Sequence, residues 1–172
     1  MIRRLFLDRS GTSAVEFAIC LPFLILLYIG GYQLVDGLSA YRKVTATART
    51  IADLTSQFTT VNDADLDTIL NASQQVMAPY RISSATMTIS QIRIDAAGLS
   101  TVDWSRGKNG AGLIVGSNFT IPAGIRTPNT WLIVASLNYN YVPNVGATLI
   151  GTIPMRDQII LNPRATARIT KT

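Results

Sequence analysis

A long, almost uninterrupted apolar segment lies near the start of the chain. Residues 14–35 hold twelve Leu, Ile, Val or Phe side chains and a single charged one, Glu16. A helix over residues 12–35 would be about 36 Å long, enough to cross a hydrocarbon core of about 30 Å. Each of these apolar side chains favours insertion by about 0.3 to 0.6 kcal/mol, which together outweighs the roughly 3 kcal/mol cost of one charge. The pattern predicts one membrane-spanning helix.

Apolar positions continue beyond this segment at helical spacing. The positions concerned recur every three to four residues: Val44, Ala48, Ile51, Thr55 and Phe58. We therefore expect one helix over residues 12–58, about 70 Å long, whose second half packs against a folded domain. Two helices hinged at Asp36 and Gly37 are the alternative, because glycine weakens a helix by about 1 kcal/mol relative to alanine.

A second helix is predicted over residues 62–78. Asn62 or Asp63 caps its start, and Pro79 ends it. The aspartates at positions 63, 65 and 67 resemble part of a calcium loop, but the glycine and glutamate that complete such a loop are missing from the required places. We interpret these aspartates as capping residues, which are favourable in the first turn of a helix.

Beyond Pro79 the apolar pattern changes to a period of two. Residues 85–89 alternate in one phase and residues 92–94 in the other, which predicts a bulge near Ser90 and Gln91. Further strands are expected at residues 102–104, 131–142, 159–161 and 164–170, with Ala165, Ala167 and Ile169 facing inward in the last. Residues 95–98 read as a turn and residues 105–124 as a loop. The sequence predicts an α+β fold, in which a long N-terminal transmembrane helix is followed by a second helix and an antiparallel β-sheet domain.

Basic residues precede the apolar segment. Arg3, Arg4 and Arg9 account for much of the net charge of +5. By the positive-inside rule they place the N-terminus in the cytoplasm and the bulk of the chain on the other side of the membrane. A cleaved signal peptide is the alternative, but the apolar run is too long, contains Glu16 and is followed by no Ala-x-Ala-like site. The remaining Lys and Arg form no run, so we expect no nucleic acid partner.

The composition argues against an enzyme. The chain has no histidine, and both its one glutamate and its one cysteine, Cys20, lie in the apolar segment. The usual acid–base and nucleophile sets are therefore missing, and the spacing of Asp95, Asp103 and Asp157 indicates no shared site. The glycines of residues 107–116 lack the Lys-Ser/Thr pair of a phosphate loop. We expect no catalytic, cofactor-binding or metal-binding residues.

Glu16 is the residue of the apolar segment that calls for a role. An ionisable side chain within a membrane helix is a functional candidate, and its partner must be named. Gly11 lies five residues earlier, directly after the basic stretch. A cut after Gly11 would give Thr12 a positive α-amine and make Glu16 the fifth residue of the mature chain. The carboxylate could then pair with the α-amine of a neighbouring copy, because buried opposite charges favour pairing.

These residues resemble the start of a known family. The stretch of residues 9–18, with Phe17 directly after Glu16, followed by Leu21 and Pro22, is similar to the start of TadE-like proteins. These are minor pilins, or pseudopilins, of the tight adherence (Flp, type IVc) pilus system. Residues 41–55 also resemble the membrane-distal helix of this group. The resemblance implies a pilin-like fold divided into a basic leader (residues 1–11), a transmembrane helix with its membrane-distal extension (residues 12–58) and an extracytoplasmic α+β domain (residues 59–172).

The resemblance also implies a function in pilus biogenesis. A prepilin peptidase would cut between Gly11 and Thr12, and Glu16 with Phe17 would serve subunit pairing within the membrane. Other expected partners are the major Flp pilin, other minor pilins, an inner-membrane assembly platform, an assembly ATPase and membrane lipid. The protein would be a single-pass inner-membrane protein with a periplasmic C-terminal domain, or a component of the pilus. The alternative is a generic membrane-anchored binding or scaffold domain that is not processed.

Overall fold

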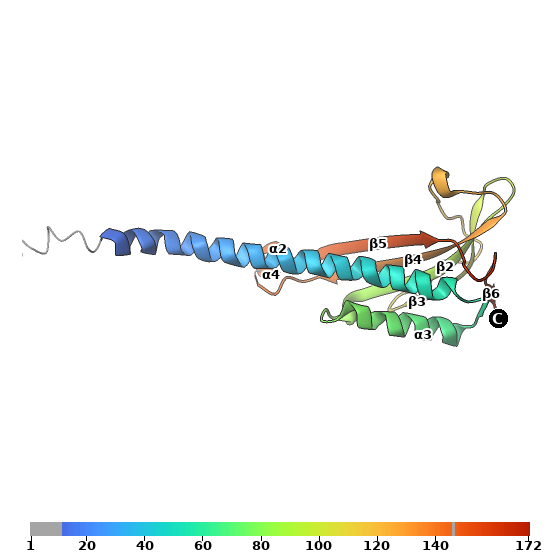
Figure 1. The fold of residues 1–172 in the computed structure, drawn as a ribbon, viewed down its shortest axis with the longest axis horizontal. Helices are drawn as coiled ribbons and strands as arrows, with labels where there is room; N and C mark the ends of the chain where they lie inside the picture. Colours follow the sequence, from blue (N-terminus) through green and yellow to red (C-terminus); the bar gives the residue numbers. More distant parts are fainter. Residues whose placement is uncertain (1–11, 146) are drawn as a thin grey trace, which may run out of the picture.

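One continuous helix takes up about a quarter of the chain. The computed structural model describes residues 12–145 and 147–172, so the expected leader at residues 1–11 lies outside the described residues. Helix α2 (Thr12–Ser56) has 45 residues and is about 67 Å long at 1.5 Å per residue. Its first half projects beyond the folded domain, and its second half lies along the sheet (Figure 1). The helix passes through Gly37 without a break, as the one-helix prediction required.

The second half of α2 is held to the domain by a stripe of small and apolar residues. All eight buried residues of the helix lie in this half: Ala40, Val44, Thr47, Ala48, Ile51, Ala52, Thr55 and Ser56. They recur at spacings of three and four, which places them on one face. Four of the eight are alanine or serine-sized, so the helix backbone can approach the sheet closely.

Helix α3 (Asp63–Gln74) packs beside α2 and buries Leu66 and Leu70. Its start is fixed by a reciprocal capping box, in which Asn62 Oδ1 accepts a hydrogen bond from Asp65 N at 2.9 Å and Asp65 Oδ2 accepts one from Asn62 N at 3.0 Å. A short 3-10 turn, η2 (Gln75–Met77), follows before Pro79. The predicted second helix and its Asn62 cap are therefore confirmed.

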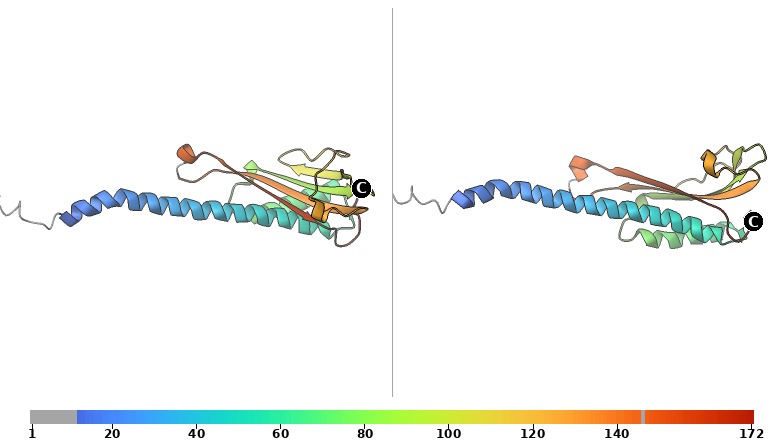
Figure 2. Two further views of the ribbon diagram at one scale, coloured as in Figure 1. Left: turned by 90° about the horizontal axis from the view of Figure 1, so that it is seen from above. Right: turned by 45° about the horizontal axis from the view of Figure 1, so that its top comes forward.

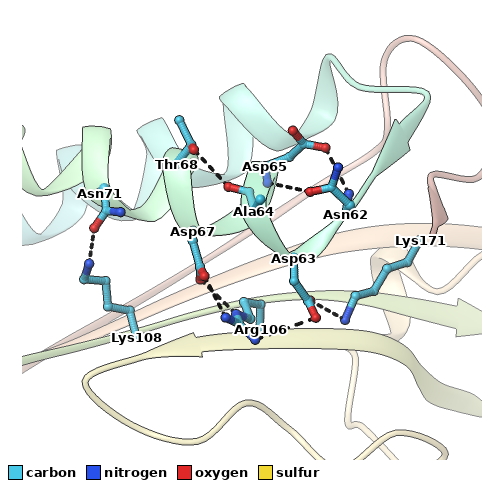
Figure 3. A network of polar contacts seen from close by, with 10 residues as sticks. All are labelled: Asn62, Asp63, Ala64, Asp65, Asp67, Thr68, Asn71, Arg106, Lys108 and Lys171. Atoms are coloured by element: carbon cyan, nitrogen blue, oxygen red, sulfur yellow. Dashed lines mark hydrogen bonds and ion pairs between the residues drawn. The ribbon is translucent and has the colours of Figure 1, made fainter.

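The other two aspartates of this helix attach it to the sheet. Arg106, on strand β3 (Ser100–Lys108), donates from Nε and Nη2 to the two carboxylate oxygens of Asp67 at 2.8 and 2.6 Å (Figure 3). Lys171 Nζ lies 2.7 Å from Asp63 Oδ1. The hydrogen bond from Arg106 lowers the pKa of Asp67. Only Asp65 thus serves as a cap, whereas Asp63 and Asp67 form exposed ion pairs that orient α3.

The sheet is antiparallel, with strand order β3–β2–β4–β5. Its other strands are β2 (Ala85–Ile94), β4 (Thr130–Tyr141) and β5 (Ile153–Leu161). Helix α2 lies over β4 and β5, and α3 lies on the β3 side of the same face (Figures 1 and 2). The predicted α+β fold with an antiparallel sheet is confirmed. Two predicted bounds were too narrow, because β5 begins at Ile153 and β3 continues to Lys108.

The change of phase within β2 has a cause other than the predicted bulge in that strand. Ala85, Met87 and Ile89 face the core under the helices, whereas Ile92 and Ile94 face a second, smaller cluster on the opposite side of the sheet. The pairing of β2 with β4 is regular over its whole length. The register shift occurs opposite Gln91 and Ile92, in the pairing with β3, where Asp103 is the extra residue. The irregularity is real, but it belongs to β3.

The predicted final strand over residues 164–170 was wrong. The chain forms only β6 (Thr170–Lys171), which pairs in parallel with β1 (Thr60–Val61). Ala165 and Ala167 are exposed rather than inward, and only Ile169 of the three is buried. The backbone N–H groups of residues 164 and 165 instead donate to Ser56 O, at 2.8 and 3.3 Å. These residues satisfy a carbonyl at the end of α2, where no intrahelical donor remains.

Ile169 is held in the core by a buried glutamine. Its N–H donates to Gln91 Oε1 at 2.9 Å, and its carbonyl accepts from Gln91 Nε2 and Trp104 Nε1, each at 3.1 Å. Both side chains come from the central part of the β2–β3 pair. The C-terminal segment therefore closes the end of the core that lies furthest from the start of α2.

Candidate functional site

The first half of α2 presents an apolar surface to its surroundings. Its large side chains are strongly exposed, for example Phe23 at 70 % and Leu27 at 74 %. A contiguous apolar surface of this extent indicates a membrane or protein contact. Among the described residues, α2 is the one helix long and apolar enough to span a membrane, and none of its most apolar stretch is buried in the protein. The helix is consistent with single-pass anchoring.

The predicted pairing residues lie at the N-terminal end of the described helix. Thr12 is its first residue, and Glu16 follows one turn later on the same face. Phe17 is 58 % exposed. Within the described residues, Glu16 is exposed and makes no hydrogen bond or ion pair. The structure thus places Thr12, Glu16 and Phe17 together, far from the sheet, while Gly11 lies outside the described residues.

A polar cluster lies near the middle of α2, between its exposed first half and the half that packs on the domain. Asp36 Oδ2 accepts a hydrogen bond from the Tyr141 hydroxyl at 2.6 Å, and Asp36 Oδ1 accepts one from the Tyr80 hydroxyl at 2.9 Å. Asn144 Nδ2 lies 3.4 Å from Oδ2. The rings of Tyr80 and Tyr141 meet edge to face, with centroids 6.3 Å apart. Asp36 is therefore fixed at the point where the helix leaves the domain.

Sequence reasoning missed this cluster, which we call the Asp36 cluster (Asp36, Tyr80, Tyr141 and Asn144). Its members come from α2, from the segment after η2, from the end of β4 and from the loop that follows β4, so no local pattern joins them. One signal was available, because Asp36 is a lone acid at the end of the apolar run and needs a partner if its surroundings are apolar. The two tyrosines, with hydroxyl donors on apolar rings, suit that requirement.

The surroundings of Tyr80 and Tyr141 in the Asp36 cluster disfavour deprotonation of their hydroxyl groups. Burial, the hydrogen bond to Asp36 and the negative charge of Asp36 raise the pKa of Tyr80 to about 12. Burial is also the largest cause that raises the pKa of Tyr141 above its ordinary value, and Asp36 adds to it. The folded state therefore holds these two phenolic protons more tightly than the unfolded chain does.

This cluster predicts a loss of stability at alkaline pH. The stabilisation is complete below pH of about 10, the ordinary tyrosine pKa, and is lost as the pH rises through about 12. Titration of tyrosinate absorbance in the detergent-solubilised protein should show a late component from Tyr80 and Tyr141. Asp36→Asn should move this component part of the way towards the ordinary value, because burial remains. Tyr41→Phe, outside the cluster, should leave it in place. An unchanged late component in Asp36→Asn would contradict the assignment.

Asp95, Asp103 and Asp157, the aspartates considered above for a shared catalytic site, make separate local contacts. Asp95 Oδ1 accepts from Leu99 N at 2.8 Å in the turn after β2, and Asp157 Oδ1 accepts from Gln158 N at 2.8 Å. Asp103 accepts from Gln91 Nε2 at 2.7 Å and pairs with Arg168 at 3.1 Å. In the part of the chain that the structure describes, no group of three or more His, Cys, Asp or Glu side chains is placed to hold a metal ion.

Fold and site together define a class of protein, in which a single exposed apolar helix carries an α+β domain at its far end. The sequence model of the family described as TadE-like protein matches residues 11–53, about a quarter of the chain. The match confirms the family resemblance over the first part of the chain and suggests a protein related to the tight adherence pilus. TadE-like proteins are generally non-enzymatic, and their family suggests pilus components as partners. The match covers Thr12, Glu16, Phe17 and most of α2, but not the sheet. No curated protein and no solved structure matches the chain.

Proposed function

We propose that the protein is a minor pilin, or pseudopilin, that acts in biogenesis of a tight adherence (Flp, type IVc) pilus. The observation that carries the proposal is the position of Glu16 at the N-terminal end of the described apolar helix, where it is exposed and has no partner in the described chain. A carboxylate in such a place is costly unless an opposite charge reaches it. The family match over residues 11–53 supports the assignment to this pilus system.

The positive charge that pairs with Glu16 is created by cleavage of the chain. A prepilin peptidase cuts between Gly11 and Thr12, and the α-amine of Thr12 becomes a second charge at the depth of Glu16. When two such helices lie side by side, the carboxylate of one pairs with the α-amine of the other, and Phe17 contributes apolar contact beside the pair. Leaving either charge unpaired in the low-dielectric membrane costs about 3 to 5 kcal/mol, so the pair favours association of subunits.

The same proposal sets the orientation and the partners. The basic leader stays in the cytoplasm, α2 crosses the inner membrane once, and the sheet domain lies in the periplasm or in the pilus. The partners are the prepilin peptidase, the major Flp pilin, other minor pilins, the inner-membrane assembly platform and membrane lipid. Residues 1–11 form the leader, residues 12–58 the transmembrane helix with its extension, and residues 59–172 the extracytoplasmic domain.

The proposal is tested by the mature N-terminus. Mass spectrometry of the protein purified from cells should find Thr12 as the first residue, and a strain without the prepilin peptidase should retain residues 1–11. Gly11→Val, which places a branched side chain at the cut, should block processing, whereas Ser10→Ala should not. An intact N-terminus in the presence of the peptidase would overturn the processing step and leave a membrane-anchored scaffold domain.

A further inference from the structure

The connection between β4 and β5 is unusually apolar for an exposed loop. We call residues 142–145 and 147–152 the tip loop; it contains the single turn α4 (Ala147–Ile150). The chain has no charged residue between Arg126 and Arg156, so neither the loop nor its flanks carry a charge. Val142, Val145 and Ile150 are nevertheless 54 %, 45 % and 56 % exposed. An exposed loop of this composition indicates a contact with a membrane or with another protein.

The tip loop lies beside the membrane-spanning part of α2. It reaches further towards the start of α2 than any other part of the folded domain (Figures 1 and 2). Gln33 Nε2 donates a hydrogen bond to Val145 O, which fixes the loop against the helix. Gln33 belongs to the apolar run of residues 14–35, and Tyr32 beside it is 52 % exposed, as in an aromatic girdle at a membrane surface. The loop therefore lies at the depth where the membrane segment ends.

The loop and the helix enclose an apolar groove of about 740 Å³. Its helix side includes Ile29 and Leu34. Its other side includes Val145 and Ile150 of the loop and Ile153 of β5. Leaving such a surface in water costs about 25 cal/mol for each Å² of apolar area. The groove needs an apolar occupant.

We propose that the tip loop is a second membrane contact, which enters the leaflet nearest the domain so that lipid acyl chains fill the groove. Three observations favour lipid over a second protein copy. The groove is continuous with the helix surface that must itself lie in lipid. The loop has no charge that insertion would have to desolvate. Two backbone carbonyls of the described loop also have internal partners, since Val145 O accepts from Gln33 and Ala147 O accepts from Gly151 N at 2.9 Å, which lowers the cost of removing them from water.

This contact requires the membrane span but no cut at Gly11, so it stands or falls independently of the proposed processing. It gives the domain a fixed orientation on the membrane, because two separate points, α2 and the tip loop, touch the bilayer. The Asp36 cluster lies directly beyond the loop, where Asn144 of the loop contacts Asp36. The polar cluster therefore marks the boundary between the part of the protein in lipid and the part outside it.

The depth of the tip loop is tested with a fluorescent label on the full-length protein. Cys20→Ala removes the one native thiol. Ile150→Cys then carries an environment-sensitive dye in the loop, and Leu99→Cys carries it in the turn at the opposite end of the sheet, where exposure is similar at 51 %. Both proteins are reconstituted into vesicles of phosphatidylethanolamine and phosphatidylglycerol, with or without bromine on the acyl chains. The tryptophan emission of both variants checks that the domain is folded.

The label at position 150 should emit at shorter wavelength than the label at position 99 and should be quenched several-fold more strongly by brominated acyl chains. This difference should persist when the protein is diluted in lipid. Two results would overturn the proposal. Water-like emission at both positions would place the loop outside the bilayer. A shielded label that bromine does not quench, and whose shielding increases with protein density, would show that a second copy fills the groove.

Discussion

Glu16→Ala is expected to abolish assembly of the protein with other pilus subunits while leaving its insertion into the membrane intact. The substitution removes the carboxylate that would pair with the α-amine of a neighbouring Thr12, and leaves that amine unpaired. Breaking a buried pair in this way costs about 3 to 5 kcal/mol, a hundredfold or more in an association constant. Insertion itself should improve, because a charge costing about 3 kcal/mol leaves the membrane segment.

The effects of the substitution on membrane insertion and on pilus assembly are separated by measuring both in the same cells. Resistance to alkaline extraction reports insertion, the mature N-terminus reports processing, and the sheared pilus fraction reports assembly. Ser13→Ala lies on the same helix end and serves as the matched control, while Glu16→Asp tests whether a carboxylate on a shorter side chain restores part of the assembly. Normal pili in a processed and inserted Glu16→Ala protein would refute the pairing role.

Ile51→Ala is expected to destabilise the domain by about 2 to 5 kcal/mol. Ile51 is completely buried in the main core, on the face of α2 that packs against the sheet. Its truncation leaves a cavity in a region where α2, α3 and the sheet meet, and a rigid long helix cannot collapse into that space. Both tryptophans of the chain, Trp104 and Trp131, lie on sheet strands, so their fluorescence reports unfolding of the domain rather than of the membrane segment.

The measurement is denaturant unfolding of the full-length protein in detergent. Arg49→Ala is the matched control, since Arg49 is exposed on the same helix and its loss should cost less than about 0.5 kcal/mol. A midpoint shift of similar size in both variants would show that the second half of α2 contributes helix stability but no core packing.

The helices were predictable because their signals are local. The spacing of Val44, Ala48 and Ile51 matches one helical face, and it predicted a single helix through Gly37, which the structure confirms. The cap at Asn62 was likewise readable from neighbouring residues. The prediction of a final strand failed because the alternation of apolar and polar residues over 164–170 is the same whether the chain pairs with a sheet or caps a helix end. The contact of residues 164 and 165 with Ser56 decided between them.

The Asp36 cluster could not be predicted from the sequence, for another reason. Its hydrogen bonds join residues 44 and 105 positions apart, so they exist only once the sheet and the long helix have met. The proposed pairing site was named from local sequence, because Thr12 and Glu16 lie one helical turn apart and need no tertiary contact, and their pairing stays a prediction. What the sequence alone did not reveal was the apolar groove, which forms between residues 26–38 of α2 and the distant tip loop.

The continuous α2 has a mechanical consequence. One helix serves both as the apolar anchor and as part of the domain core, with no hinge between the two halves. A pull along its axis is therefore transmitted directly to the sheet, and the shear is shared by the eight buried residues between Ala40 and Ser56. If the helix is drawn out of the bilayer, the domain must rise by the same distance. The tip loop, held to α2 by the hydrogen bond from Gln33 to Val145 O, would then be drawn away from the bilayer together with the helix.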